Sequence, residues 1–194
     1  MDAVTTRRSG SETKAEILRV ALEQFTERGY DGTSIRDIAE ALGITKSSLY
    51  YHFANKEAIV RALLDGRRNE IDELLAWVGE QDPGADLLRR TALRWVESSG
   101  RERVQGMRFA HANRSIMQKL AAEGTDRRSW FDAVVDAVLP STTSPVDRLR
   151  AQMAFDTVSA ALFAAQGTVA TDDDVLAAAR DATVRLTEAD KPSR

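Results

Sequence analysis

TSIRDIAEALGITKSSLYYHFANK, residues 33–56, carries the strongest structural signal in this chain. Within it, Ala39, Gly43 and Leu49 follow one another at intervals of four and six residues. Ala39 is small enough for two helices to cross closely, Gly43 can adopt positive φ where the first helix ends, and Leu49 packs back from the second helix. This spacing is typical of a helix-turn-helix. It predicts a second helix that begins near Thr45, with its outer face free to enter the major groove of DNA.

The outer face of this second helix is rich in cations and hydroxyl groups. No acidic residue occurs between Glu40 and Glu57. Cationic and hydroxyl donors without carboxylates suit a polyanion such as DNA. The residues of this helix that we expect to contact DNA are Thr45, Lys46, Ser47, Ser48, Tyr50, Tyr51 and His52. The alternative for one of the two tyrosines is packing against the first helix of the domain.

Flanking residues are expected to hold the DNA backbone. Thr33 or Ser34 caps the helix before the turn, whose free amides could also hold a phosphate. A purely capping role is the alternative for both residues. Arg36 on the same helix and Lys56 at the start of the next one complete the predicted DNA-binding set.

These residues also resemble a known family. The run from Thr13 to Val60 is similar to the DNA-binding domain of the tetracycline-repressor (TetR/AcrR) family of bacterial transcription regulators. The resemblance covers about a quarter of the chain and is carried by Phe25, Gly29-Tyr30, Thr33-Ser34, Ile38-Ala39, Gly43, Leu49-Tyr50-Tyr51-His52-Phe53 and Lys56-Glu57.

The resemblance implies an all-α fold. A three-helix head with the helix-turn-helix is joined by a long fourth helix to a helical body that binds ligand and dimerises. It implies a homodimer in which the last two helices, about residues 145–166 and 172–188, pair with their copies as a four-helix bundle. It further implies binding to double-stranded DNA at a palindromic operator and an unknown small-molecule effector. Periodicity alone would also be satisfied if these two helices packed within one chain.

We expect three parts along the chain. Residues 1–12 form a flexible tail, residues 13–55 the helix-turn-helix domain, and residues 56–194 the effector-binding and dimerisation domain. Thr13 and Glu16 have the spacing of a capping box at the start of the first helix.

Helical spacing continues through the rest of the sequence. Apolar residues recur from Ile59 to Val78, which predicts a long helix between head and body. The stripe from Val104 to Met117 is expected to be a single helix, and no stretch alternates like a strand. About nine helices are predicted in total.

Two polar residues interrupt this last stripe, namely His111 and Arg114. Buried polar groups need partners, which could be an acid of the same core, a ligand or the second subunit. We favour structural pairing over ligand contact. The residues that could line an effector pocket are Trp95, Met107, His111, Arg114, Met117 and Trp130, although apolar residues at helical spacing more often form ordinary core.

Composition limits the other possibilities. The net charge is −3, but residues 1–68 carry 11 Lys/Arg against 10 Asp/Glu, whereas the rest carries 16 against 20, so basic character is local. The chain has no cysteine and two histidines, so we expect no metal and no cofactor. The N-terminus lacks an apolar signal segment and the longest uncharged run has 15 residues, so we expect a cytoplasmic protein without a membrane span.

Three function classes were compared. The leading hypothesis is a sequence-specific DNA-binding regulator. The family that it resembles consists most often of repressors, and we therefore expect a repressor that a small molecule releases from its operator. The alternative is a helical architectural DNA binder or a protein-interaction module without effector. An enzyme is disfavoured because the sequence has no cysteine, no Gly-rich phosphate loop and no HExxH motif.

Overall fold

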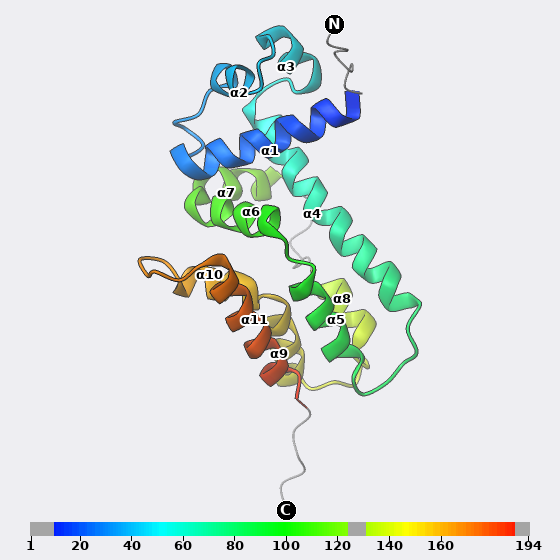
Figure 1. Ribbon diagram of the computed structural model, residues 1–194. Coiled ribbons are helices and arrows are strands. Elements are labelled where there is room, and N and C mark those ends of the chain that lie inside the picture. The colour runs from blue at the N-terminus through cyan, green and yellow to red at the C-terminus, as the bar shows by residue number, and fades with distance from the viewer. Residues whose placement is uncertain (1–9, 124–130, 189–194) are drawn as a thin grey trace, which may run out of the picture.

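The computed structural model describes residues 10–123 and 131–188, which contain helices and no strand (Figure 1). The predicted all-α class is therefore confirmed. None of the helices in these two ranges is long and apolar enough to cross a membrane. The helices are α1 (Gly10–Arg28), α2 (Ile35–Ala41), α3 (Lys46–His52), α4 (Lys56–Gly79), α5 (Leu87–Glu97), α6 (Arg101–Ala112), α7 (Arg114–Glu123), α8 (Asp132–Val138), α9 (Pro145–Phe155), α10 (Thr157–Ala164) and α11 (Asp172–Leu186).

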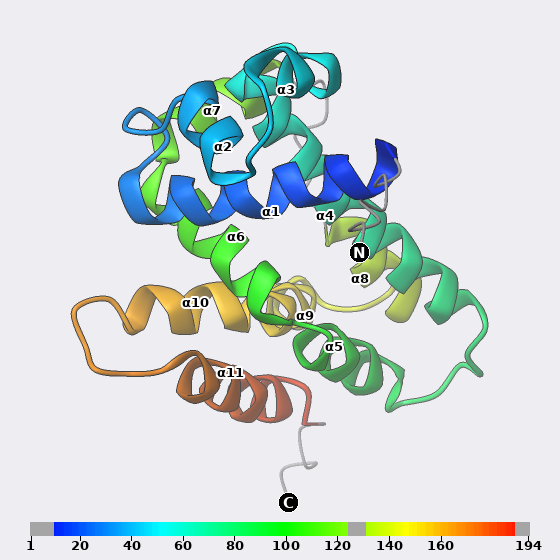
Figure 2. The ribbon, with the colours of Figure 1, turned by 45° about the horizontal axis from the view of Figure 1, so that its top comes forward.

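The molecule is elongated, with α1, α2 and α3 at one end (Figure 1). Helix α4 runs from this head along the body, and α9, α10 and α11 lie at the opposite end. Helices α6 and α7 lie directly against the head, and Figure 2 shows α6 crossing between α1 and the lower helices. Helices α10 and α11 pack side by side in both views.

The helix-turn-helix is built as its sequence predicts. Gly43 has φ +65°, and the amide of the next residue, Ile44, donates to the Ala39 carbonyl at 3.0 Å. This bond and the one from the Gly43 amide to the Glu40 carbonyl, at 3.1 Å, close α2 with a Schellman motif. Ala39 and Leu49 are both buried, so the two helices pack closely around them.

The predicted fourth helix is also present. The Asn55 side chain accepts a hydrogen bond from the Ala58 amide at 2.8 Å and so caps α4. From there α4 continues for 24 residues, longer than the head alone requires. The first half of α4 packs into the core of the head and its second half into the core of the body. The helix therefore fixes the orientation of the head relative to the body.

The described residues contain eleven helices where about nine are predicted, because two predicted helices are broken. The first break is at Asn113, which leaves helical geometry at φ −119° and ψ 49°. Its side-chain oxygen accepts from the Tyr30 amide at 2.9 Å, and its side-chain nitrogen donates to the Phe109 carbonyl at 2.9 Å. Asn113 therefore ends α6 in order to satisfy a backbone group of the head.

The second break, at Asp156, divides the predicted helix over residues 145–166 into α9 and α10. The buried Thr183 hydroxyl of α11 lies 2.8 Å from the Thr157 hydroxyl and donates to the Ala154 carbonyl at 3.2 Å. A carbonyl near the break, that of Ala154, thus receives a hydrogen bond from a neighbouring helix.

The first helix also begins earlier than predicted. Thr13 lies inside α1, which starts at Gly10, so the expected capping box at Thr13 does not form the helix start. The residues before Thr13 can adopt helical geometry, and Glu12 in the first turn interacts favourably with the positive end of the helix dipole. Residues 1–9 of the predicted tail lie outside the described residues.

The apolar core of the head is not closed by the head alone. It contains Ile17, Phe25, Ile38 and Leu49 of the first three helices, but also Phe109 of α6 and two residues of α7, Ile116 and Leu120. A second cluster joins α4, α5, α8 and α9, and a third joins α5, α6, α10 and α11. Helix α6 therefore contributes to the core of the head and to the core of the body.

The glycines of this fold give a test of the turn. In Gly43→Ala, the added Cβ meets no atom within 4 Å, so the loss comes from positive φ and we expect about 1 kcal/mol of destabilisation. Gly66→Ala, in the middle of α4 with equally open space, is expected to stabilise by up to about 1 kcal/mol. Chemical denaturation of both variants measures the difference. Equal effects would contradict the assignment of the turn.

Candidate nucleic-acid interface and the adjoining cavity

Helix α3 presents a polar face above a buried apolar one. Thr45 caps the helix, because its hydroxyl oxygen accepts from the Ser48 amide at 3.1 Å. Leu49 is fully buried, whereas Tyr51 is 86% exposed and Tyr50 is 49% exposed. Both tyrosines therefore reach solvent, Tyr51 more fully than Tyr50.

The remaining predicted residues of α3 differ in exposure. Lys46 and Ser47 are exposed, while Ser48 and His52 are half-buried. The His52 ring meets the Tyr51 ring edge-on, with centroids 5.3 Å apart. The structure thus brings a cation, a hydroxyl and two phenols together on one outer surface, which can donate to phosphates or to base edges.

The start of α2 forms the edge of this surface. Ser34 and Asp37 make a reciprocal capping box, in which the Asp37 carboxylate accepts from the Ser34 amide at 2.7 Å. Hydrogen bonds from the Ser34 side chain and amide hold the pKa of Asp37 below its usual value. Arg36 is exposed and pairs with Glu40 at 2.6 Å. Because a solvent-exposed ion pair contributes little free energy, a phosphate can replace Glu40 as the partner of Arg36 at little cost.

The prediction for Thr33 is contradicted by its burial. Its side chain is 1% exposed, and its hydroxyl donates to the Gly29 carbonyl at 3.0 Å, with the Gln24 carbonyl at 3.2 Å. The hydroxyl is used to close the turn after α1. It is not available to a phosphate, so Thr33 does not belong to the candidate surface.

Lys56 is also engaged inside the head. Its amino group donates to the Tyr30 carbonyl at 2.6 Å and to the Thr33 carbonyl at 2.7 Å, and it lies 4.3 Å from the centre of the Tyr30 ring. Two of its three protons are thus used. A lysine in the first turn of a helix interacts unfavourably with the helix dipole. This position in the sequence was therefore a sign that the Lys56 amino group has acceptors elsewhere.

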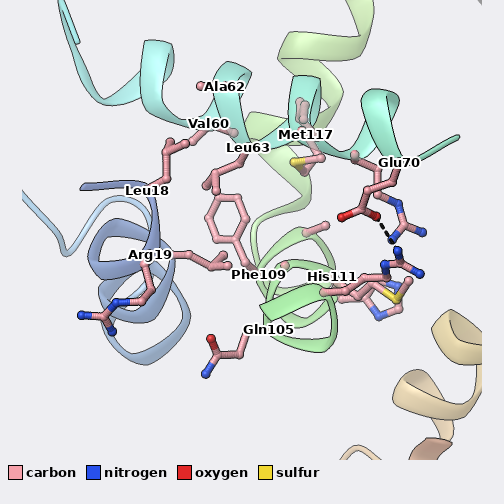
Figure 3. A pocket seen from close by; sticks show the side chains of 18 of the residues that line it. Leu18, Arg19, Val60, Ala62, Leu63, Glu70, Gln105, Phe109, His111 and Met117 are labelled. Atoms are coloured by element: carbon pink, nitrogen blue, oxygen red, sulfur yellow. Dashed lines mark ion pairs between the residues drawn. The ribbon is translucent and has the colours of Figure 1, made fainter. Parts of the chain in front are cut away.

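A cavity of about 580 Å³ lies beside the head, between α1, α4, α6 and the start of α10 (Figure 3). Three of the predicted pocket residues, Met107, His111 and Met117, line it. Leu18 and Leu22 of α1 also line it, and so do Arg67 and Glu70 of α4. The head and the body therefore both form the wall of this cavity.

The other three predicted pocket residues do not line the cavity. Arg114 is exposed at the start of α7, because the break at Asn113 turns it away from the stripe that it would have continued in a single helix. Trp95 is buried and is covered by two guanidinium groups. Trp130 lies outside the described residues.

Sequence reasoning missed the charged residues of this cavity. Arg67 falls four residues after Leu63 and four before Ile71, so it stands on the apolar stripe of α4. A charge at such a position is a sign of a buried partner or a ligand. The Arg67 and Arg103 guanidinium groups lie 4.7 and 4.1 Å from the centre of the Trp95 ring.

His111 has a partner at the cavity wall. Its Nε2 lies 3.0 Å from the Ser159 hydroxyl, so the structural pairing that we favoured is present at a residue that also faces the cavity. Asp156 lies beside this pair and hydrogen-bonds to Ser159, and burial raises its pKa. Among the residues described, no group of three or more His, Asp or Glu could hold a metal ion.

Comparison with known proteins agrees with this geometry. Residues 17–63 match the family described as "Bacterial regulatory proteins, tetR family". The chain is 39% identical over 83 residues to the HTH-type transcriptional regulator TtgR of Pseudomonas putida, a match that covers 43% of this chain and 39% of TtgR. It is 49% identical over 53 residues to the HTH-type transcriptional repressor KstR2 of Mycobacterium tuberculosis, covering 27% of this chain and 26% of KstR2.

The likeness of fold extends over the whole chain. The crystal structure of Mycobacterium smegmatis AmtR is 27% identical and superposes with a TM-score of 0.58, covering 95% of this chain and 90% of that one. The curated relatives match over less than half of their own length. The helix-turn-helix domain of this chain belongs to the tetR family, as its motifs predicted, and the chain as a whole shares its fold with solved TetR-family regulators, such as the one from Bordetella parapertussis (22% identical, TM-score 0.61, covering 89% of this chain and 94% of that one).

The assignment of Lys56 to the head can be tested by unfolding. Lys56→Met leaves two carbonyls without their charged donor, and we expect a loss of about 2 kcal/mol in the free energy of unfolding. Lys46→Met removes the same charge at an exposed position and is expected to change stability by less than about 0.5 kcal/mol. Urea titration measures both, and equal losses would contradict the internal role of Lys56.

Proposed function

We propose that this protein is a sequence-specific DNA-binding transcription regulator, a repressor that a small molecule releases from a palindromic operator. The observation that carries the proposal is the outer face of α3, where Lys46, Ser47 and Tyr51 are exposed without an acid over the buried Leu49. A short helix with such a face, held at a fixed angle by Gly43, fits the major groove.

The proposed operator is palindromic because we infer that the protein is a homodimer. Helix α9 carries an exposed apolar stripe of Val146, Leu149 and Met153, each more than half exposed, and Phe163 of α10 is 57% exposed. Residues spaced by three and four share one helix face, and an apolar face of this kind is stabilised when a second copy covers it. Two-fold symmetry then presents two copies of α3 to two half-sites.

The cavity supplies the proposed effector site. Its wall includes α1 of the head as well as α4 and α6 of the body, so a ligand inside it contacts both parts. A ligand that fits one arrangement of head and body better than the other shifts the population toward the arrangement it fits. We propose no catalytic activity, and we propose that the protein acts in the cytoplasm, where it reaches DNA.

The DNA-binding surface is tested with an operator selected from random duplexes. Lys46→Ala and Tyr51→Ala are expected to weaken binding to this operator by at least about tenfold, because each removes a donor at the groove. Arg68→Ala removes an exposed charge on α4 and should leave binding within about twofold. Fluorescence anisotropy measures all three, and full binding by the α3 variants would refute the assigned surface.

The sequence selectivity is tested by salt. A complex that prefers the selected operator over random duplex at 200 mM salt supports a regulator, since sequence-independent binding weakens steeply as salt rises. Loss of all preference at that salt would favour the architectural alternative.

The dimer is tested by placing a charge on the α9 stripe. Leu149→Glu is expected to give monomers, because two buried carboxylates would face each other across the two-fold axis. Gln118→Glu on the exposed side of α7 is the matched control and should stay dimeric. Sedimentation velocity distinguishes the two masses, and a dimeric Leu149→Glu would exclude this interface.

A further inference from the structure

The cavity beside the head has an apolar end and a polar end. Figure 3 shows Leu18, Val60, Leu63 and Phe109 together on one side, with Glu70 and His111 on the other. An occupant that is apolar throughout would leave the polar end unmatched, and a fully polar occupant would leave the apolar end unmatched. The wall is therefore suited to an amphipathic molecule.

The charges at the polar end of the cavity decide which polar group of a ligand fits there. Arg103 has its partners within the protein. Its Nη1 donates to the Trp95 carbonyl and the Ser98 hydroxyl, both at 2.9 Å, and its Nη2 pairs with Glu70 at 2.8 Å. Arg103 and Glu70 thus neutralise each other as an ion pair, and what stays without a hydrogen-bond partner at this pair, within the two described ranges, is the Arg103 Nε and the Glu70 Oε2.

Arg67 is in the opposite situation. Its guanidinium is stacked on Trp95 at 4.7 Å, so its position is fixed, yet its buried Nη1 has no hydrogen-bond partner among the described residues. Burial and the nearby charge of Arg103 lower the pKa of Arg67 to about 10. A buried guanidinium with an unused donor is stabilised by an oxyanion, with which it can make paired hydrogen bonds.

The charges of Glu70 and Asp156 act on Arg67 and partly offset the lowering of its pKa, but among the described residues neither carboxylate forms an ion pair with it. Glu70 is paired with Arg103, and Asp156 is hydrogen-bonded to Ser159. Burial raises the pKa of Asp156, and the hydrogen bond from Ser159 and the charges of His111 and Arg67 act in the opposite direction. No ion pair joins Asp156 to Arg67 in the described part of the chain.

We propose that the effector is an amphipathic carboxylate, bound with its anionic group on Arg67 and its apolar body between Leu18, Leu63 and Phe109. The proposal rests on the proposed function, which requires an effector, and adds the chemical class and the anchoring residue. Since Leu18 belongs to α1 and Phe109 to α6, the apolar body of this ligand lies between the head and the helix that supports it.

The test uses the full-length protein and three ten-carbon probes that differ only in the head group, measured by titration calorimetry without DNA. Decanoate is expected to bind at least tenfold more tightly than decan-1-ol, and decylammonium more weakly than either. Shortening decanoate to octanoate should weaken binding roughly fourfold per methylene removed. Equal binding of decanoate and decan-1-ol, or a preference for decylammonium, would overturn the proposal.

Variants then identify the anchor. Arg67→Met should lower decanoate binding to the level of decan-1-ol and leave decan-1-ol binding unchanged, while Arg67→Lys should keep a preference for the anion. Arg19→Met is the matched control, because Arg19 lines the same cavity but is paired with Glu16 at 2.7 Å. Thermal melts verify that each variant is folded. A preference for decanoate that persists in Arg67→Met would refute the role of Arg67.

The regulatory part is measured separately on the selected operator. Decanoate should release the wild-type protein from DNA and should not release Arg67→Met, which is expected to bind the operator normally. If decanoate binds without releasing DNA, the site stands and its role as effector site is refuted. If the protein binds no DNA, the proposed function fails, while the calorimetry still decides the ligand class.

Discussion

The packing of Phe109 on Phe25 is the contact on which the rest of this structure depends. The two rings stack with centroids 5.5 Å apart and join α6 to the core of the head. Two polar contacts accompany them, from the Tyr30 amide to Asn113 at 2.9 Å and from Lys119 to Glu57 at 2.8 Å. Aromatic burial supplies most of the stabilisation, because the Lys119–Glu57 ion pair is exposed to solvent. The head is thus completed by residues more than sixty positions away in sequence.

The contact between Phe25 and Phe109 also explains where the cavity lies. Helices α1 and α6 meet at Phe25 and Phe109, and Phe109 also lines the cavity together with Leu18 of α1 and Gly106 of α6. A ligand there sits next to the contact that sets the orientation of the head. Packed interfaces respond to such an insertion by adopting another arrangement, since dense cores do not deform continuously. The proposed effector would therefore act at the contact that orients α3 relative to the body.

Local signals in the sequence were enough for the helix-turn-helix and for α4, because Gly43, Leu49 and Asn55 act on neighbours within a few residues. The breaks at Asn113 and Asp156 could not be predicted in this way. Each depends on a partner distant in sequence, Tyr30 in one case and Thr183 in the other. The same holds for the site. The exposure of Tyr51 followed from helical periodicity. The hydrogen bond of Lys56 to the Tyr30 carbonyl, and the lack of a hydrogen-bond partner for the Arg67 Nη1 among the described residues, are visible only in the three-dimensional arrangement.

The charged groups of the cavity and those of α3 share no element. Arg67 and Arg103 stand on α4 and α6 and contact Trp95 of α5, whereas Lys46 and Tyr51 stand on α3. Free-energy changes at sites without common partners add almost independently. In the proposed regulator, substitutions that alter which molecule is sensed can therefore accumulate without altering which bases are read, and a duplicated copy of this gene could diverge in either property alone.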